Sequence, residues 1–136
     1  REFYRLLGFT ETVVRSEAGS GEFAAAHGFD GHIEFKGVDV SLGEGTDGST
    51  IQLRQWITPY DDTPPYPMPV NHLGIDRINF YVQDLDVVLE TMPSLGFAQK
   101  WPVGGGPGGG LVFFLDPDGI KVQLAGPRGE QPPASE

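Results

Sequence analysis

The tripeptide Leu7-Gly8-Phe9 returns as Leu95-Gly96-Phe97, and the dipeptide Gln52-Leu53 returns as Gln123-Leu124. Both copies keep the same order, with the Leu-Gly-Phe element first and the Gln-Leu element last. The first element is typical of a helix that ends at glycine, and the second lies in an alternating pattern typical of a strand. The chain therefore contains two copies of one supersecondary unit.

The repeat divides the chain into two modules. Module one covers residues 1–58 and module two covers residues 75–127, followed by a tail over residues 128–136. The connecting residues 59–74 include five prolines, and such a linker is stiff and extended. A chain of 136 residues is long enough to form a hydrophobic core without disulfides, so we predict a single domain.

Module two shows the full order of elements. Residues 76–83 alternate between apolar and polar side chains, which predicts a strand. Asp84 is a suitable N-cap for the helix that follows. Three further strands are predicted over residues 97–103, 111–115 and 120–124, which gives the order strand, helix, strand, strand, strand.

Module one has the same order without its beginning. A helix is predicted over residues 2–7, a short helix over residues 22–26, and strands over residues 9–14, 33–42 and 49–58.

Two irregularities are expected in module one. The apolar phase of its middle strand shifts at Gly37, which predicts a β-bulge there. No strand has room before Arg1, so we expect roughly 10–15 residues, a strand and a turn, to precede this sequence in the natural chain.

Composition excludes several classes of function. The formal net charge is −10, and an acidic surface repels phosphate backbones, so nucleic acid is not an expected partner. No apolar run approaches the roughly 20 residues that span a bilayer, so no membrane association is expected. No signal peptide is visible and the expected location is cytoplasmic. The chain has no cysteine, which excludes disulfides and thiolate metal sites.

Four segments carry a family resemblance: FYRLLGF at 3–9, RINFYVQDLD at 77–86, FFLDPDG at 113–119 and VQL at 122–124. With these segments the chain resembles the vicinal oxygen chelate superfamily, which includes glyoxalase I, bleomycin-resistance proteins and extradiol dioxygenases. The resemblance implies an α+β fold in which paired βαβββ modules form a cup-shaped mixed sheet, the first strand of module one being absent here. It also implies a ligand inside the cup and a homodimer.

The polar phase of the strands supplies the candidate ligand-binding residues. Aromatic side chains would stack on a small molecule, arginines would meet an anionic or carbonyl group, and Trp101 would close over the ligand. The alternative is that these side chains simply face water, as on any half-exposed sheet. The set expected to line one cavity is Gln52, Arg54, Trp56, Arg77, Asn79, Tyr81, Trp101 and Gln123.

The same positions argue against a metal ion. The resemblance implies metal ligands on the absent first strand, at Gln52, at Gln123 and at Arg77. A guanidinium has no lone pair to donate, and neutral amides bind hard cations less well than carboxylates. The histidines His27, His32 and His72 do not fall on predicted cup-facing positions. We therefore predict no metal and no cofactor.

Three functions remain open. The favoured one is a small-organic-molecule binding protein or a metal-independent enzyme, with catalytic residues unknown. The alternative is a metal-dependent lyase, epimerase or dioxygenase of the same superfamily, which would need ligands from the absent strand together with Gln52 and Gln123. The third is a non-catalytic structural dimer.

Overall fold

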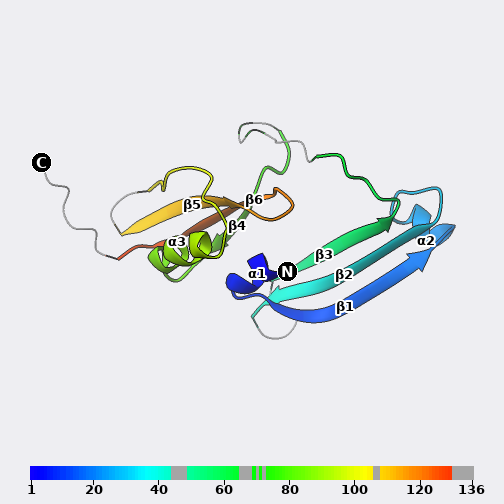
Figure 1. Cartoon of the computed structure of the whole chain (residues 1–136), viewed down its shortest axis with the longest axis horizontal. Helices are drawn as coiled ribbons and strands as arrows, with labels where there is room; N and C mark the ends of the chain where they lie inside the picture. Colours follow the sequence, from blue (N-terminus) through cyan, green and yellow to red (C-terminus); the bar gives the residue numbers. More distant parts are fainter. Residues whose placement is uncertain (44–48, 65–68, 70, 72, 106–107, 130–136) are drawn as a thin grey trace, which may run out of the picture. The chain divides into compact units, whose positions relative to one another are not determined.

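The chain forms two compact units, residues 1–64 and residues 65–136, and each is described by itself (Figure 1). The computed structural model describes residues 1–43, 49–64, 69, 71, 73–105 and 108–129. No helix within these ranges is long and apolar enough to cross a membrane. His72, parts of the linker and most of the predicted tail lie outside the described residues. That the two units form one domain stays a prediction.

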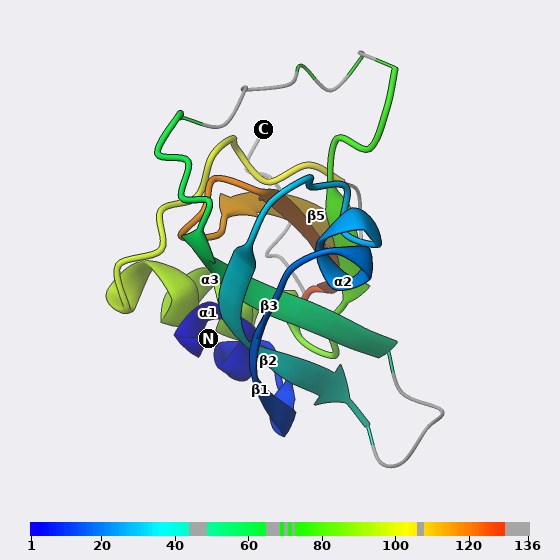
Figure 2. The same cartoon turned by 90° about the vertical axis from the view of Figure 1, so that its right-hand side faces the viewer.

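Unit one is an antiparallel sheet with two short helices. Its three strands are hydrogen-bonded in the order β1-β2-β3, and Figure 2 shows α2 beside the ends of β1 and β2. The elements are α1 (Glu2–Leu6), β1 (Thr10–Gly19), α2 (Glu22–Ala25), β2 (Ile33–Leu42) and β3 (Ser49–Thr58). The predicted short helix and the second and third strands are therefore confirmed, and the first strand extends further than expected.

Unit two is a mixed sheet with one helix, ordered β4-β6-β5. β4 pairs parallel with the last strand β6, and β5 pairs antiparallel with it. Among the described residues of unit one, no strand occupies the corresponding place beside β3. The elements are β4 (Ile78–Tyr81), α3 (Leu85–Ser94), β5 (Gly109–Leu115) and β6 (Lys121–Pro127).

The repeated Leu-Gly-Phe element has the same backbone structure in both units. Gly8 and Gly96 have φ values of 91° and 90°, a conformation that glycine adopts without strain. The Phe9 amide donates to the Tyr4 carbonyl at 3.1 Å, and the Phe97 amide donates five residues back to Met92 at 3.0 Å. Both helices therefore end in the same hydrogen-bonded turn, as the repeat predicts.

Asp84 begins α3 as expected from the sequence. Its Oδ1 accepts hydrogen bonds from the amides of Asp86 at 3.0 Å and Val87 at 3.1 Å, which satisfies two donors that the helix leaves open. The apolar residues of this helix and of the strands β5 and β6 are buried. They are Leu85, Met92, Val112, Phe114, Val122 and Leu124.

The bulge predicted at Gly37 is wrong, because Gly37 pairs regularly with both neighbouring strands. The register shifts lie elsewhere. One is between Glu11 and Val13 of β1, and the other is where β3 pairs with Glu34 and Phe35 of β2. The apolar side chains of β2 therefore change from one face of the strand to the other without a bulge at Gly37.

Different elements lie on the two faces of β2. Ile33 and Phe35 pack with Ala24 of α2 on one face. Val40, on the other face, lines a pocket with residues of α1. Gly37 allows close approach of the strands, since a Cβ there would lie 2.7 Å from the Leu53 carbonyl oxygen.

The strand predicted over residues 97–103 is reduced to isolated bridges between Gln99 and Phe114 and between Gly104 and Leu111. The Lys100 amide still donates to β5, at 2.8 Å from the Phe113 carbonyl oxygen. In that register the next donor to β5 would be the amide of residue 102. Pro102 has no amide hydrogen, so the ladder of hydrogen bonds stops there. Gly104 supplies the donor for Leu111 instead, at 2.9 Å.

Candidate functional site

The predicted residues of β3 lie on one face of unit one. Gln52, Arg54 and Trp56 are directly opposite Asp39, Gly37 and Phe35 of β2. Directly paired residues of antiparallel strands project to the same side of the sheet, so all of these share a face. Asp39 was not recognised from the sequence, because it stands between two valines in an apolar run.

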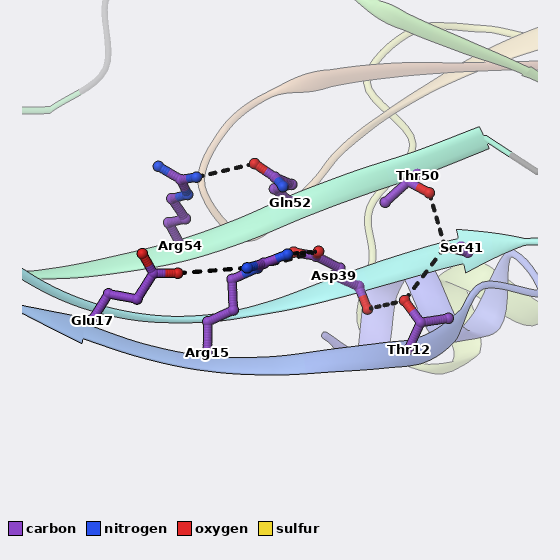
Figure 3. A network of polar contacts seen from close by, with 8 residues as sticks. All are labelled: Thr12, Arg15, Glu17, Asp39, Ser41, Thr50, Gln52 and Arg54. Atoms are coloured by element: carbon purple, nitrogen blue, oxygen red, sulfur yellow. Dashed lines mark hydrogen bonds and ion pairs between the residues drawn. The ribbon is translucent and has the colours of Figure 1, made fainter. Parts of the chain in front are cut away.

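Asp39 is held by an arginine of the neighbouring strand (Figure 3). Arg15 donates from Nη2 to Oδ2 at 2.6 Å and from Nε to Oδ1 at 3.1 Å, while Glu17 lies 3.6 Å from its Nη1. The hydrogen bond from Arg15 lowers the pKa of Asp39, although burial opposes this, and the same pair raises the pKa of Arg15. Asp39 is therefore an ionised carboxylate with its oxygens engaged.

A row of hydroxyl groups continues the same network (Figure 3). Thr12 Oγ1 donates to the Asp39 carbonyl oxygen at 3.1 Å, and the hydroxyls of Ser41 and Thr50 lie 2.9 Å apart. Thr12 Oγ1 and Ser41 Oγ are separated by 3.5 Å. These residues come from three strands, so no local sequence signal brings them together.

Arg54 contacts both a glutamine and an aromatic ring. Its Nη2 donates to Gln52 Oε1 at 3.0 Å, and its guanidinium carbon lies 4.7 Å from the centre of the Phe35 ring. The Gln52 amide oxygen therefore accepts from a positively charged side chain.

Trp56 belongs to a cluster of aromatic rings at the end of unit one that carries α2. Its ring centre lies 5.2 Å from Phe35, 5.1 Å from Phe29 and 6.5 Å from His27. His27 is fixed in turn by a 2.9 Å contact between its Nδ1 and the Phe23 carbonyl oxygen. Trp56 thus has a clear packing function, and its contact with a ligand stays a prediction.

Arg77 of unit two makes contacts of the same kind as Arg54, but with a glutamine on another strand. Its Nη1 donates to Gln123 Oε1 at 2.9 Å, and its guanidinium carbon lies 5.3 Å from the centre of the Phe113 ring. Both carboxylate oxygens of Asp76 lie 3.3 Å from its Nε. Phe113 was not selected from the sequence, because it stands in a continuous apolar run.

Trp101 packs its ring against Phe113, with ring centres 5.0 Å apart and planes at 78°. Asn79 pairs with Gln123 and lies on the same face, and Tyr81 follows two residues later. Asn79 and Tyr81 are exposed. The structure thus brings Arg77, Gln123, Phe113 and Trp101 together within unit two. That the predicted residues of both units line one cavity stays a prediction.

Comparison with known proteins identifies the fold. No family model matches the chain, and no curated protein matches it. Several solved structures are similar in fold, and three of them are described. The glyoxalase family protein from Bacillus cereus has a TM-score of 0.70 at 24% identity, over 93% of this chain and 83% of that one.

The second structure is the glyoxylase/bleomycin resistance protein/dioxygenase domain from Frankia sp. EAN1pec, with a TM-score of 0.55 at 23% identity, over 95% of this chain and 81% of that one. The third, the glyoxalase family protein from Enterococcus faecalis, has a TM-score of 0.55 at 20% identity, over 90% and 82% of the two chains. The fold class predicted from the sequence is confirmed.

Proposed function

From the premise that this chain has the glyoxalase/bleomycin-resistance fold, we propose that it binds a small organic molecule on the polar faces of its sheets without a metal ion. One observation carries the proposal. The last strand of each unit has a glutamine whose Oε1 accepts from an arginine, at 3.0 Å for Gln52 and 2.9 Å for Gln123. Each arginine also lies over a phenylalanine ring. Donors beside a flat apolar surface suit organic carbonyl and carboxylate groups.

The residues present do not fit a divalent cation. At the positions where the resemblance implies ligands, Gln52 and Gln123 direct their oxygens at guanidinium groups, and Arg77 itself has no lone pair. A cation there would meet fixed positive charge with only neutral amides to replace its water shell. Within the part of the chain that the structure describes, no three His, Asp or Glu side chains gather as a metal site.

The charged groups of unit one favour binding over proton transfer. A general base needs a pKa near the operating pH, whereas Arg15 lowers the pKa of Asp39 and occupies its oxygens. Such a carboxylate is a weak base, and it serves better to hold Arg15 in place. We therefore place ligand binding before catalysis in the proposal.

Metal analysis together with a thermal-shift screen tests this function. We expect full-length protein purified without chelator to contain well under one divalent metal per chain. We also expect EDTA to leave its melting temperature unchanged. In buffer that contains EDTA, at least one compound of a library of small carbonyl and carboxylate molecules should raise the melting temperature, because a ligand that binds the folded state stabilises it.

Two results would contradict the proposal. Stoichiometric zinc, iron, manganese or nickel that is lost in the Gln52→Ala, Gln123→Ala double variant would favour the metal-dependent lyase, epimerase or dioxygenase. A library without any stabilising compound would favour a structural dimer. A homodimer and a cytoplasmic location complete the proposal, and light scattering of the purified protein tests the first of these.

A further inference from the structure

We propose that the polar face of unit two is a subsite for a planar aromatic carboxylate, recognised by Arg77, Phe113 and Trp101. This inference rests on the proposed function and names its ligand class. It is carried by the geometry of Arg77, by the exposed ring of Trp101 that packs on Phe113, and by the charges around them.

Arg77 is positioned to receive a carboxylate. Gln123 holds Nη1 at 2.9 Å, Asp76 holds Nε at 3.3 Å and the Phe113 ring lies beneath the guanidinium, so its plane is fixed. Nη2 makes no hydrogen bond among the described residues, and the side chain is 36% exposed. Nη2 and the second N–H of Nη1 therefore remain as donors for the two oxygens of a carboxylate.

The aromatic pair beside Arg77 is exposed at Trp101, whereas Phe113 is buried beneath the guanidinium. Trp101 is 38% exposed and meets Phe113 edge to face at 5.0 Å. Offset or edge-to-face contact with a further ring stabilises such pairs. A planar ligand ring that lies on Trp101 could therefore direct its carboxylate to the neighbouring guanidinium.

The charges in contact with this pair favour an anion. Lys100 Nζ lies 5.1 Å from the centre of the Trp101 ring, and Arg77 lies over Phe113. Among the described residues, Asp76 is the acidic side chain in contact with Arg77. Two positive charges and one negative charge therefore surround the pair, in a chain whose net charge is −10.

In unit one the phenylalanine ring is fully covered, and the charges around it are balanced. Phe35 is 0% exposed, because Phe23, His27 and Trp56 surround its ring. Arg15 is neutralised there by Asp39 and Glu17. A carboxylate there would approach two acidic side chains, so unit two is the better subsite.

Titration calorimetry with 1-naphthoate tests the assignment, with 1-naphthamide as a neutral probe of the same shape. We expect the amide to bind at least about tenfold more weakly, because charge-assisted hydrogen bonds are lost. Arg77→Ala should weaken 1-naphthoate binding by a similar factor, and Arg77→Lys should not restore it, since lysine lacks the planar fork. Arg5→Ala, which removes an exposed charge on α1, should leave the affinity unchanged.

The indole Nε1–H resonances give an independent result, because Trp56 and Trp101 are the only tryptophans. The probe should shift the Trp101 signal, assigned with Trp56→Phe, and leave the Trp56 signal in place. Equal binding of acid and amide, or loss of binding in Arg54→Ala but not in Arg77→Ala, would overturn the inference. If 1-naphthoate fails while other metal-independent ligands stabilise the protein, this inference falls and the proposed function stands.

Discussion

Each unit brings an arginine, a glutamine and a phenylalanine into contact, but from different positions of its strands, and the two units differ in how far the adjoining aromatic rings are exposed. In unit one, Arg54 holds Gln52 and covers Phe35, which is fully buried by further rings. In unit two, Arg77 holds Gln123 and covers Phe113, which has Trp101 at its edge.

The difference comes from the segment that lies over each phenylalanine. The long connection between β1 and β2 brings α2 and its aromatic residues onto Phe35, whereas unit two places only the short segment around Trp101 beside Phe113. The ring of unit one is therefore fully packed, whereas Trp101 of unit two remains exposed, as the proposed subsite requires. Three tests examine this contrast, in order of decreasing expected effect.

The largest expected effect on stability is the loss of a tryptophan side chain, and it should differ between the two units. Trp56→Ala should lower the free energy of unfolding by about 2–3 kcal/mol, because it removes a half-buried ring from contact with Phe35 and Phe29. Trp101→Ala should cost about 1 kcal/mol, since that ring is more exposed. Urea unfolding of both variants measures the free energy of unfolding. Equal decreases would remove the distinction between the covered rings of unit one and the exposed Trp101 ring of unit two.

The charge pair of unit one should give an intermediate effect that depends on pH. The pKa of Asp39 is lowered below its ordinary value of 3.8, so the ionised form stabilises the folded state. That contribution is present above the unfolded pKa and is lost as pH falls through the lower folded pKa. Asp39→Asn should therefore be less stable than the natural protein at neutral pH, and the gap should narrow below about pH 4.

Denaturant unfolding between pH 7 and pH 3 measures that gap. Asp30→Asn, at an exposed position of the same unit, is the matched control and should show little difference at any pH. A gap for Asp39→Asn that grows toward acid pH would contradict the stabilising ion pair with Arg15.

Tyr81 should give the smallest effect on stability. Its side chain is 74% exposed on the face of unit two, so Tyr81→Ala should change the free energy of unfolding by less than about 0.5 kcal/mol. If Tyr81 stacks on the ligand as predicted, calorimetry should show weaker 1-naphthoate binding at unchanged stability. A large loss of stability would mean that Tyr81 is a packing residue like Trp56.

The sequence by itself determined the features that depend on neighbouring residues. The glycine ends of two helices, the N-cap at Asp84 and the alternation that places Gln52, Arg54 and Trp56 on one face follow from helix capping and strand periodicity. These local rules, repeated twice, predicted two modules of the same element order, and the family resemblance then implied the fold class.

Only the tertiary structure decided which side chains meet. Arg15 reaches Asp39 because their strands are adjacent in a specific register, and Arg77 reaches Gln123 across 46 positions of sequence. Strand order and register result from packing of the whole unit, which no local pattern specifies. The same packing buries Phe35 beneath α2 and leaves Trp101 exposed, so it decides which aromatic ring faces solvent.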